Sequence, residues 1–155
     1  MFLIYLYLCC LNRPFDDLSQ ERVSLEAKAV ELIIDRCRNA QWHLLGSTAI
    51  DIELARTPTV ERKQQMMIWA GLAKTKVTLS DDIITRSQEL AGLGFKYFDA
   101  LHIACAENGN ADVLLTTDDR MLRLAARSSA ILKVRVENPA RWSEEVINDR
   151  SNDRS

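Results

Sequence analysis

The stretch YFDALHIACAENGNADVLLTTDDRMLRLAAR, residues 97–127, decides the fold of this chain. Residues 100–106 are almost all apolar, which predicts a helix buried in a core. The Asn-Gly-Asn sequence at 108–110 ends this helix. The apolar run at 113–115 is too short for a helix and predicts a buried strand of a parallel sheet. Thr-Thr-Asp-Asp follows that strand, and a second helix is expected to begin at once with Arg120.

Two acids stand at the junctions of this stretch. Asp99 lies in the first turn of the buried helix, where the positive end of the helix dipole favours a carboxylate. Asp118 follows the strand at 113–115, and polar residues in such a place mark the usual ligand crevice of an open α/β sheet. The ordinary alternative for Asp118 or Asp119 is the N-cap of the next helix, a common role for Asp.

Strands and helices alternate along the rest of the chain. This order predicts a single three-layer α/β/α domain with a mostly parallel central sheet. Strands are expected within residues 1–11, 42–45, 77–79 and 131–136, and helices over about 21–38, 49–56, 60–74 and after Ser80. The domain is expected to span residues 1–140, and the polar repeat NDRSNDRS predicts a partly disordered tail within 141–155.

The composition is that of an ordinary globular protein of 155 residues, 47% hydrophobic and 27% charged. Its net charge of −2 argues against bulk coating of nucleic acid, so any such contact requires a local basic patch. The four cysteines include no C-x-x-C pair, so neither a zinc site nor a disulfide framework is predicted. The apolar run at 1–11 is too short to span a bilayer and lacks the marks of a signal peptide, so we expect a cytoplasmic protein that does not enter a membrane.

These residues carry a family resemblance. FDALHIACAENGNADVLLTTDD, residues 98–119, resembles the second half of a PIN domain, the nuclease fold of VapC-type toxins in bacterial toxin–antitoxin pairs. STAIDIE, residues 47–53, is similar to the family's Ser-to-Glu segment. YLYLCCLNRPFDD, residues 5–17, resembles a subgroup that reads Tyr-Leu-Asp-Thr before Cys-Cys-Leu-Asn-Arg-Pro. The resemblance runs from about residue 3 to about residue 136 and implies a PIN-like domain over residues 1–140.

Three acids, Glu53, Asp99 and Asp118, fall where this architecture would bring them together. Neighbouring carboxylates raise each other's pKa unless a cation balances them, and Mg²⁺ is bound by a few carboxylates together with waters and a substrate phosphate. The resemblance implies that these three acids are the metal ligands and catalytic residues of a Mg²⁺- or Mn²⁺-dependent ribonuclease. Supporting roles beside the metal are expected for Asp119, Thr116 and Thr117.

A local basic patch follows Asp118. Arg120, Arg123 and Arg127 lie at i, i+3 and i+7 and share one face of the predicted helix. They are candidates for binding the phosphate backbone of RNA beside the acids, and the alternative is an ordinary solvated helix face. Arg13 and Arg56 flank the two other corners of the expected site, where each either reaches substrate or pairs with the acids.

Position 7 departs from the family pattern. The family places its first acid at the end of the first strand, where this chain has Tyr7, and a phenol that is neutral near pH 7 is a poor Mg²⁺ ligand. Three interpretations stay open. The chain keeps a weakened one-metal site on the other three acids, Asp16 or Asp17 substitutes for the missing acid, or the protein binds without cutting.

We therefore consider two functions, one with a working metal site and one without. The first is a metal-dependent endoribonuclease, the toxin of a type II toxin–antitoxin system, which acts on RNA as a homodimer and is paired with a small antitoxin. The second is a catalytically degenerate PIN-like module that binds RNA or an antitoxin. The apolar helix at 60–74 is a candidate interface, and His102 is expected to be a structural histidine because no second His or Cys is spaced to join it.

Overall fold

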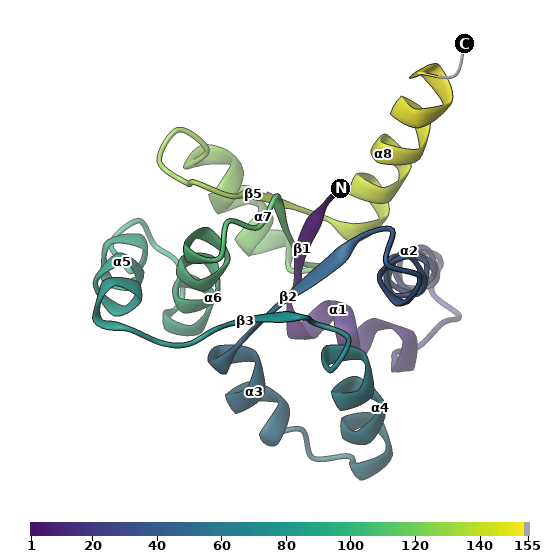
Figure 1. Ribbon diagram of the computed structural model, residues 1–155, viewed down its shortest axis with the longest axis horizontal. Coiled ribbons are helices and arrows are strands. Elements are labelled where there is room, and N and C mark those ends of the chain that lie inside the picture. The colour runs from purple at the N-terminus through teal and green to yellow at the C-terminus, as the bar shows by residue number, and fades with distance from the viewer. Residues whose placement is uncertain (154–155) are drawn as a thin grey trace.

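A five-stranded, all-parallel sheet forms the centre of the molecule (Figure 1). The computed structural model describes the backbone of residues 1–153 and the side chains of residues 1–148. The strands are ordered β3-β2-β1-β4-β5 across the sheet. They span Leu3–Leu6 (β1), His43–Ser47 (β2), Thr75–Val77 (β3), Val113–Leu115 (β4) and Arg135–Glu137 (β5). The sequence-based prediction of a mostly parallel α/β sheet is therefore confirmed.

Helices cover both faces of this sheet. In Figure 1, α2 and α8 lie on one side of it, α5 and α6 lie on the other, and α3 and α4 close its lower end. The helices span Leu8–Asn12 (α1), Glu21–Arg38 (α2), Thr48–Ala55 (α3), Val60–Ala70 (α4), Asp81–Ala91 (α5), Tyr97–Asn108 (α6), Asp119–Arg127 (α7) and Pro139–Asp153 (α8), and Arg13–Phe15 is a short 3-10 helix. Residues 100–106 of α6 are all buried, as their apolar sequence predicts.

The two middle strands are apolar along their whole length because helices cover both of their faces. Every residue of β4 is buried, and so are Ile4, Tyr5 and Leu6 of β1. Leu6 lies opposite Leu115, so the two strands end side by side. This register brings the residues that follow β1 and β4 to one edge of the sheet.

The first strand is shorter than the apolar run at 1–11 suggests. β1 ends at Leu6, and the backbone N–H groups of Cys10 and Leu11 bond to the carbonyl oxygen of Tyr7 as α1 begins. Apolar side chains of both elements enter the same core, so hydrophobicity alone does not separate them. The last strand is also shorter than predicted, because the segment before Arg135 turns back toward Ser128.

The packed domain extends beyond residue 140, the boundary expected from the sequence. Trp142 and Val146 of α8 are buried in the core. The Trp142 ring makes edge-to-face contacts with Phe2 and Trp42, both at a centroid distance of 5.2 Å. Helix α8 therefore docks on the N-terminal strand and on the end of α2, and of the expected tail only residues 154–155 lie outside the described residues.

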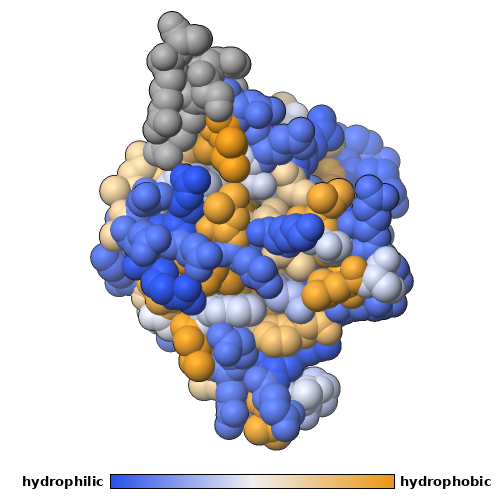
Figure 2. Space-filling model, turned by 90° about the vertical axis from the view of Figure 1, so that its right-hand side faces the viewer, coloured by the Kyte–Doolittle hydropathy of each residue, from blue (hydrophilic) through white to orange (hydrophobic). Residues whose placement is uncertain are grey.

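The surface on the α2 and α8 side is mainly hydrophilic. Figure 2 shows this face with separate hydrophobic spots between larger hydrophilic areas. Over the described part of the chain, no helix combines the length and the apolar character needed to cross a bilayer.

Replacing Trp142 with Ala tests whether α8 belongs to the domain. The change removes a side chain that is 2% exposed, and we expect the free energy of unfolding to fall by about 3 kcal/mol. Urea denaturation followed by circular dichroism measures the loss, with the exposed neighbour Arg141→Ala as the control. Equal stability of the two variants would show that the domain ends before α8.

Candidate functional site

The candidate site lies at the edge of the sheet where the parallel strands end. Tyr7 follows β1, and its backbone N–H donates to the carbonyl oxygen of Leu115 at 3.1 Å. Asp118 follows β4. Glu53 reaches this edge from α3, which begins directly after β2, and Asp99 reaches it from the first turn of α6. The topology thus brings the predicted acids to the same side of the sheet, as expected for an α/β fold.

Tyr7 occupies the position that the family resemblance assigns to an acid, and it acts there as a hydrogen-bond donor. Its hydroxyl donates to Asp99 Oδ1 at 2.6 Å. Burial raises the pKa of the Tyr7 phenol far above its usual value, and the bond to Asp99 raises it further. The phenol is therefore neutral at any ordinary pH, and it offers a proton rather than a negative charge.

The carboxyl group of Asp99 is perturbed by its surroundings. Burial raises its pKa above the ordinary value, the hydrogen bond from Tyr7 opposes that shift, and the charge of Asp118 adds to it. Asp118 is therefore close enough for its charge to act on the Asp99 carboxyl, and Tyr7 donates a hydrogen bond to that carboxyl.

Glu53 is held by a buried polar network. Its Oε1 lies 3.1 Å from His102 Nε2, within ion-pair distance although without the alignment of a hydrogen bond. The other ring nitrogen, Nδ1, lies 2.6 Å from the Tyr5 hydroxyl, which lies 2.7 Å from Ser47 Oγ. A carboxylate beside Nε2 favours a proton on that nitrogen, so Nδ1 accepts from Tyr5.

This network connects four elements of the fold, β1, β2, α3 and α6. Ser47 also caps α3 by accepting from the Ile50 N–H, and the Tyr7 ring packs on the His102 ring at a centroid distance of 4.4 Å. His102 is fully buried, as expected for a structural histidine, and its position fixes both Glu53 and Tyr7. No local pattern in the sequence indicates that the four side chains of this network, those of Tyr5, Ser47, Glu53 and His102, contact one another.

Asp118 is the N-cap of α7. Its Oδ1 accepts from the backbone N–H groups of Arg120 at 2.9 Å and Met121 at 3.2 Å. The capping alternative considered for this residue is confirmed. Asp118 caps α7 and also lies near enough for its charge to act on Asp99, which is in the first turn of α6.

The three predicted metal ligands are brought to one edge but not into one cluster. Among the described residues, no group of three His, Cys, Asp or Glu side chains is arranged to hold a metal ion. Glu53 faces His102, Asp99 accepts from Tyr7, and Asp118 caps a helix. With a neutral phenol at position 7, this donor set does not fit the Mg²⁺ or Mn²⁺ site that the resemblance implies.

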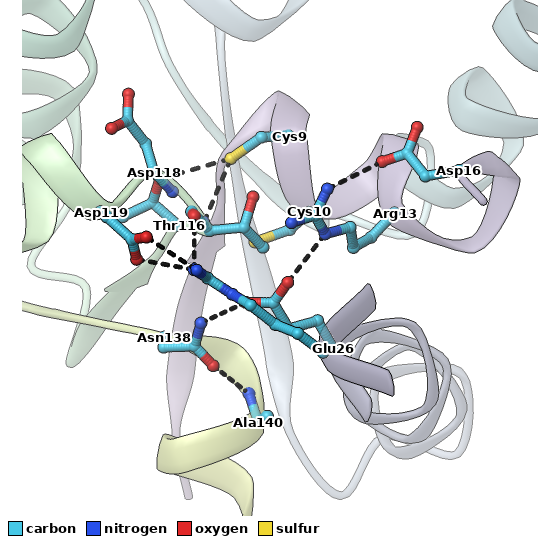
Figure 3. Close-up of polar contacts among 12 residues, drawn as sticks. Cys9, Cys10, Arg13, Asp16, Glu26, Thr116, Asp118, Asp119, Asn138 and Ala140 are labelled. Carbon is cyan, nitrogen blue, oxygen red and sulfur yellow. Dashed lines mark hydrogen bonds and ion pairs between the residues drawn. The ribbon is translucent and has the colours of Figure 1, made fainter. Parts of the chain in front are cut away.

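The residues expected to support a metal hold the strand-to-helix turn instead. Thr116 Oγ1 accepts from the Asp118 N–H at 3.2 Å and lies 3.3 Å from Cys9 Sγ (Figure 3). The Thr117 N–H donates to the same sulfur at 3.3 Å. Asp119 forms a bidentate ion pair with Arg22, at 2.6 and 2.7 Å, which holds the pKa of this carboxyl below its usual value.

Arg13 belongs to a buried ion-pair network. Its Nε donates to Glu26 at 2.8 Å and its Nη1 to Asp16 at 3.1 Å, while Asn138 Nδ2 donates to Glu26 from the other side (Figure 3). Arg13 and Asp16 are therefore partners in the scaffold, and Asp16 does not replace the missing acid. The arginines of α7 predicted to bind RNA are all exposed: Arg120, Arg123 and Arg127.

The fold matches that of one chain in a solved structure. The crystal structure is described as VapBC2 from Rickettsia felis bound to a DNA fragment from their promoter. The match has a TM-score of 0.54 at 16% identity and covers 88% of this chain and 98% of that one. At this identity the likeness concerns the fold, and it confirms that the three-layer architecture is PIN-like. No protein-family model matches the sequence, and no curated protein does.

Replacing Asp99 with Asn tests the perturbed carboxyl. Because the pKa of Asp99 is raised by folding, the folded protein loses stability as pH rises through that pKa, whereas an amide stays neutral and still accepts from Tyr7. We expect the unfolding free energy of Asp99→Asn, relative to wild type, to increase between about pH 4 and about pH 7, as measured by urea denaturation.

Asp119→Asn is the control, for which we expect the opposite change of stability with pH. Arg22 lowers the pKa of the wild-type Asp119 carboxyl, so the carboxylate stabilises the fold above its unfolded pKa. That stabilisation is lost as pH falls. The Asn variant should therefore be the less stable one at pH 7, with the difference shrinking toward low pH. The same pH trend in both variants would contradict the assigned environments.

Proposed function

We propose that this chain is a PIN-like protein of the toxin–antitoxin type that binds RNA and an antitoxin but lacks the metal-dependent ribonuclease activity of the family. The observation that carries the proposal is the hydrogen bond from Tyr7 to Asp99 at 2.6 Å, where the family has a carboxylate. The likeness of the fold to a VapBC2 chain supports the toxin–antitoxin assignment. We expect the protein to meet these partners in the cytoplasm.

The chemical reason lies in what a divalent cation requires. Mg²⁺ and Mn²⁺ take charged oxygen ligands, and the cation orients water and neutralises the phosphodiester. Tyr7 adds no charge, its hydroxyl bonds to Asp99 Oδ1, and its ring packs on the His102 ring. A cation would have to displace the hydrogen bond from Tyr7 at Asp99 and compete with the backbone N–H groups of α7 at Asp118.

A weak ribonuclease is the second candidate, and one observation favours it. The charge of Asp118 raises the pKa of Asp99, so two carboxyl groups are still close together at the sheet edge. A Mg²⁺ or Mn²⁺ ion bound by Asp99 and Asp118, with Glu53 nearby, would reproduce part of the family site. The test below separates the two candidates.

The Tyr7→Asp variant supplies the missing acid. We expect Mn²⁺ titration calorimetry to detect binding in this variant and none in wild type. We also expect Mn²⁺-dependent cleavage of single-stranded RNA to exceed that of wild type by about 100-fold or more. Tyr7→Phe is the matched control, because it frees Asp99 from the hydroxyl without adding a carboxylate, and it should stay inactive.

Two outcomes would contradict this proposal. Metal-dependent cleavage by wild type that Asp99→Asn abolishes would establish the ribonuclease. A folded Tyr7→Asp variant that neither binds Mn²⁺ nor cuts RNA would show that position 7 is not what disables the site.

The surface of α4 supports the proposed protein partners. A cavity of about 580 Å³ lies between α3, α4 and the β2–β3 edge, with Ile50, Leu54 and Met67 in its wall, and we assign it to the antitoxin. Val60 and Ile68 are each 63% exposed on α4, and we assign this apolar surface to a homodimer.

The dimer is tested by sedimentation equilibrium. Wild type should sediment as a dimer and Ile68→Glu as a monomer, because a charge at the centre of an apolar interface remains unpaired. Leu25→Glu, an equivalent change on the exposed side of α2, should leave the dimer intact. A monomeric wild type, or a dimeric Ile68→Glu variant, would contradict this interface.

A further inference from the structure

Tyr97 is a large aromatic residue that the fold leaves exposed beside the acid edge. It is the first residue of α6, it is 63% exposed, and it lies two residues before Asp99. Its ring meets the Phe98 ring edge-to-face at a centroid distance of 5.5 Å. This contact leaves the remaining ring surface of Tyr97 in water, and neither the core nor the network around His102 uses it.

Three cations lie on or against residues 94–98, each from a different part of the fold. Arg56, which caps the end of α3, places its Cζ 5.5 Å from the centroid of the Phe98 ring. Lys96 precedes Tyr97, and its charge acts on the Asp99 carboxyl. Arg120, in the first turn of α7, donates from Nη2 to the carbonyl oxygen of Gly94 at 3.5 Å.

These three cations differ from Arg13 and Arg22, the two other cations whose ion pairs place them near the site. Arg13 and Arg22 are each paired with two carboxylates. No ion pair between described residues involves Arg56, Lys96 or Arg120, and all three are exposed. Exposed, unpaired cations are free to bind phosphate.

We propose that Tyr97, together with Arg56, Lys96 and Arg120, forms a platform for single-stranded RNA. An unpaired base stacks on the Tyr97 ring, and the cations bind the phosphates on either side of it. The inference rests on the proposed function in one respect, the binding of RNA at the acid edge. It assigns the strand type and the stacking residue, and it adds Lys96 to the cations that the sequence indicates for substrate binding.

Physical reasons favour a single strand over a duplex. A base offers its face to an aromatic side chain only when it is not stacked inside a helix. The cations gather on or against the short segment 94–98 instead of along a continuous stripe, which suits phosphates that flank one splayed nucleotide. The net charge of −2 leaves no general attraction for nucleic acid, so this local group must supply the contact.

The platform is tested by fluorescence anisotropy with a labelled oligouridylate in EDTA, so that neither metal nor cleavage enters. Tyr97→Ala should weaken binding about 5- to 100-fold, and Tyr97→Phe should retain it because the stacking face is kept. Ile131→Ala, at another exposed apolar position, should bind as wild type does. Circular dichroism confirms that each variant is folded.

The cations are tested by the salt dependence of the same binding. Lys96→Gln and Arg120→Gln should each reduce the slope of log K against log salt by about 0.7, the contribution of one phosphate contact on a single strand. Lys28→Gln, at an exposed position of α2 that has no role in the platform, should leave the slope unchanged. An unlabelled duplex should compete poorly.

The outcomes separate the platform from the proposed function. RNA binding that Tyr97→Ala leaves unchanged, or equal competition by duplex and single strand, overturns the platform and leaves RNA binding intact. A wild type that binds no oligouridylate overturns RNA binding and the platform together. The metal and cleavage results for Tyr7→Asp are independent of Tyr97, so a failure there does not affect the platform.

Discussion

An acid that folding removes from water needs a hydrogen-bond donor of its own, and this requirement shapes the structure. Glu26 is the clearest case. Its side chain is 1% exposed, and it accepts from Arg13, Arg22 and Asn138. A buried carboxylate without such partners costs several kcal/mol, so these donors must be in place when the core closes. Through them, Glu26 ties α2 to the segment after β1 and to the residue before α8.

The same requirement applies at the acid edge, where each carboxylate has a separate partner. Asp99 accepts from Tyr7, Asp118 accepts from backbone N–H groups of α7, and Glu53 lies at ion-pair distance from a ring nitrogen of His102. In a metal site, one cation balances several carboxylates at once. Here the three acids have three different partners within the protein.

Local patterns in the sequence predict much of this fold. The bounds of α2 and β4 agree with the predicted ones because helical spacing and a short apolar run are properties of neighbouring residues. The contacts of Asp119 with Arg22 and of Glu53 with His102 depend on strand order and register, which no local pattern contains. The positions of the strand ends predict that the acids lie near one another, but they do not predict the hydrogen-bond or ion-pair partner of each acid.

A tyrosine instead of an acid at position 7 changes the charge and the hydrogen bonding around Asp99. A carboxylate in place of Tyr7 would remove the donor of Asp99 and add a second negative charge beside it, while Asp118 already raises the pKa of Asp99. A bound cation would stabilise such an edge, so metal binding and folding would become linked. Tyr7 removes that link, because its neutral hydroxyl bonds to Asp99 and its ring packs on His102. The residue that we propose disables the metal site is thus also one that the fold accommodates.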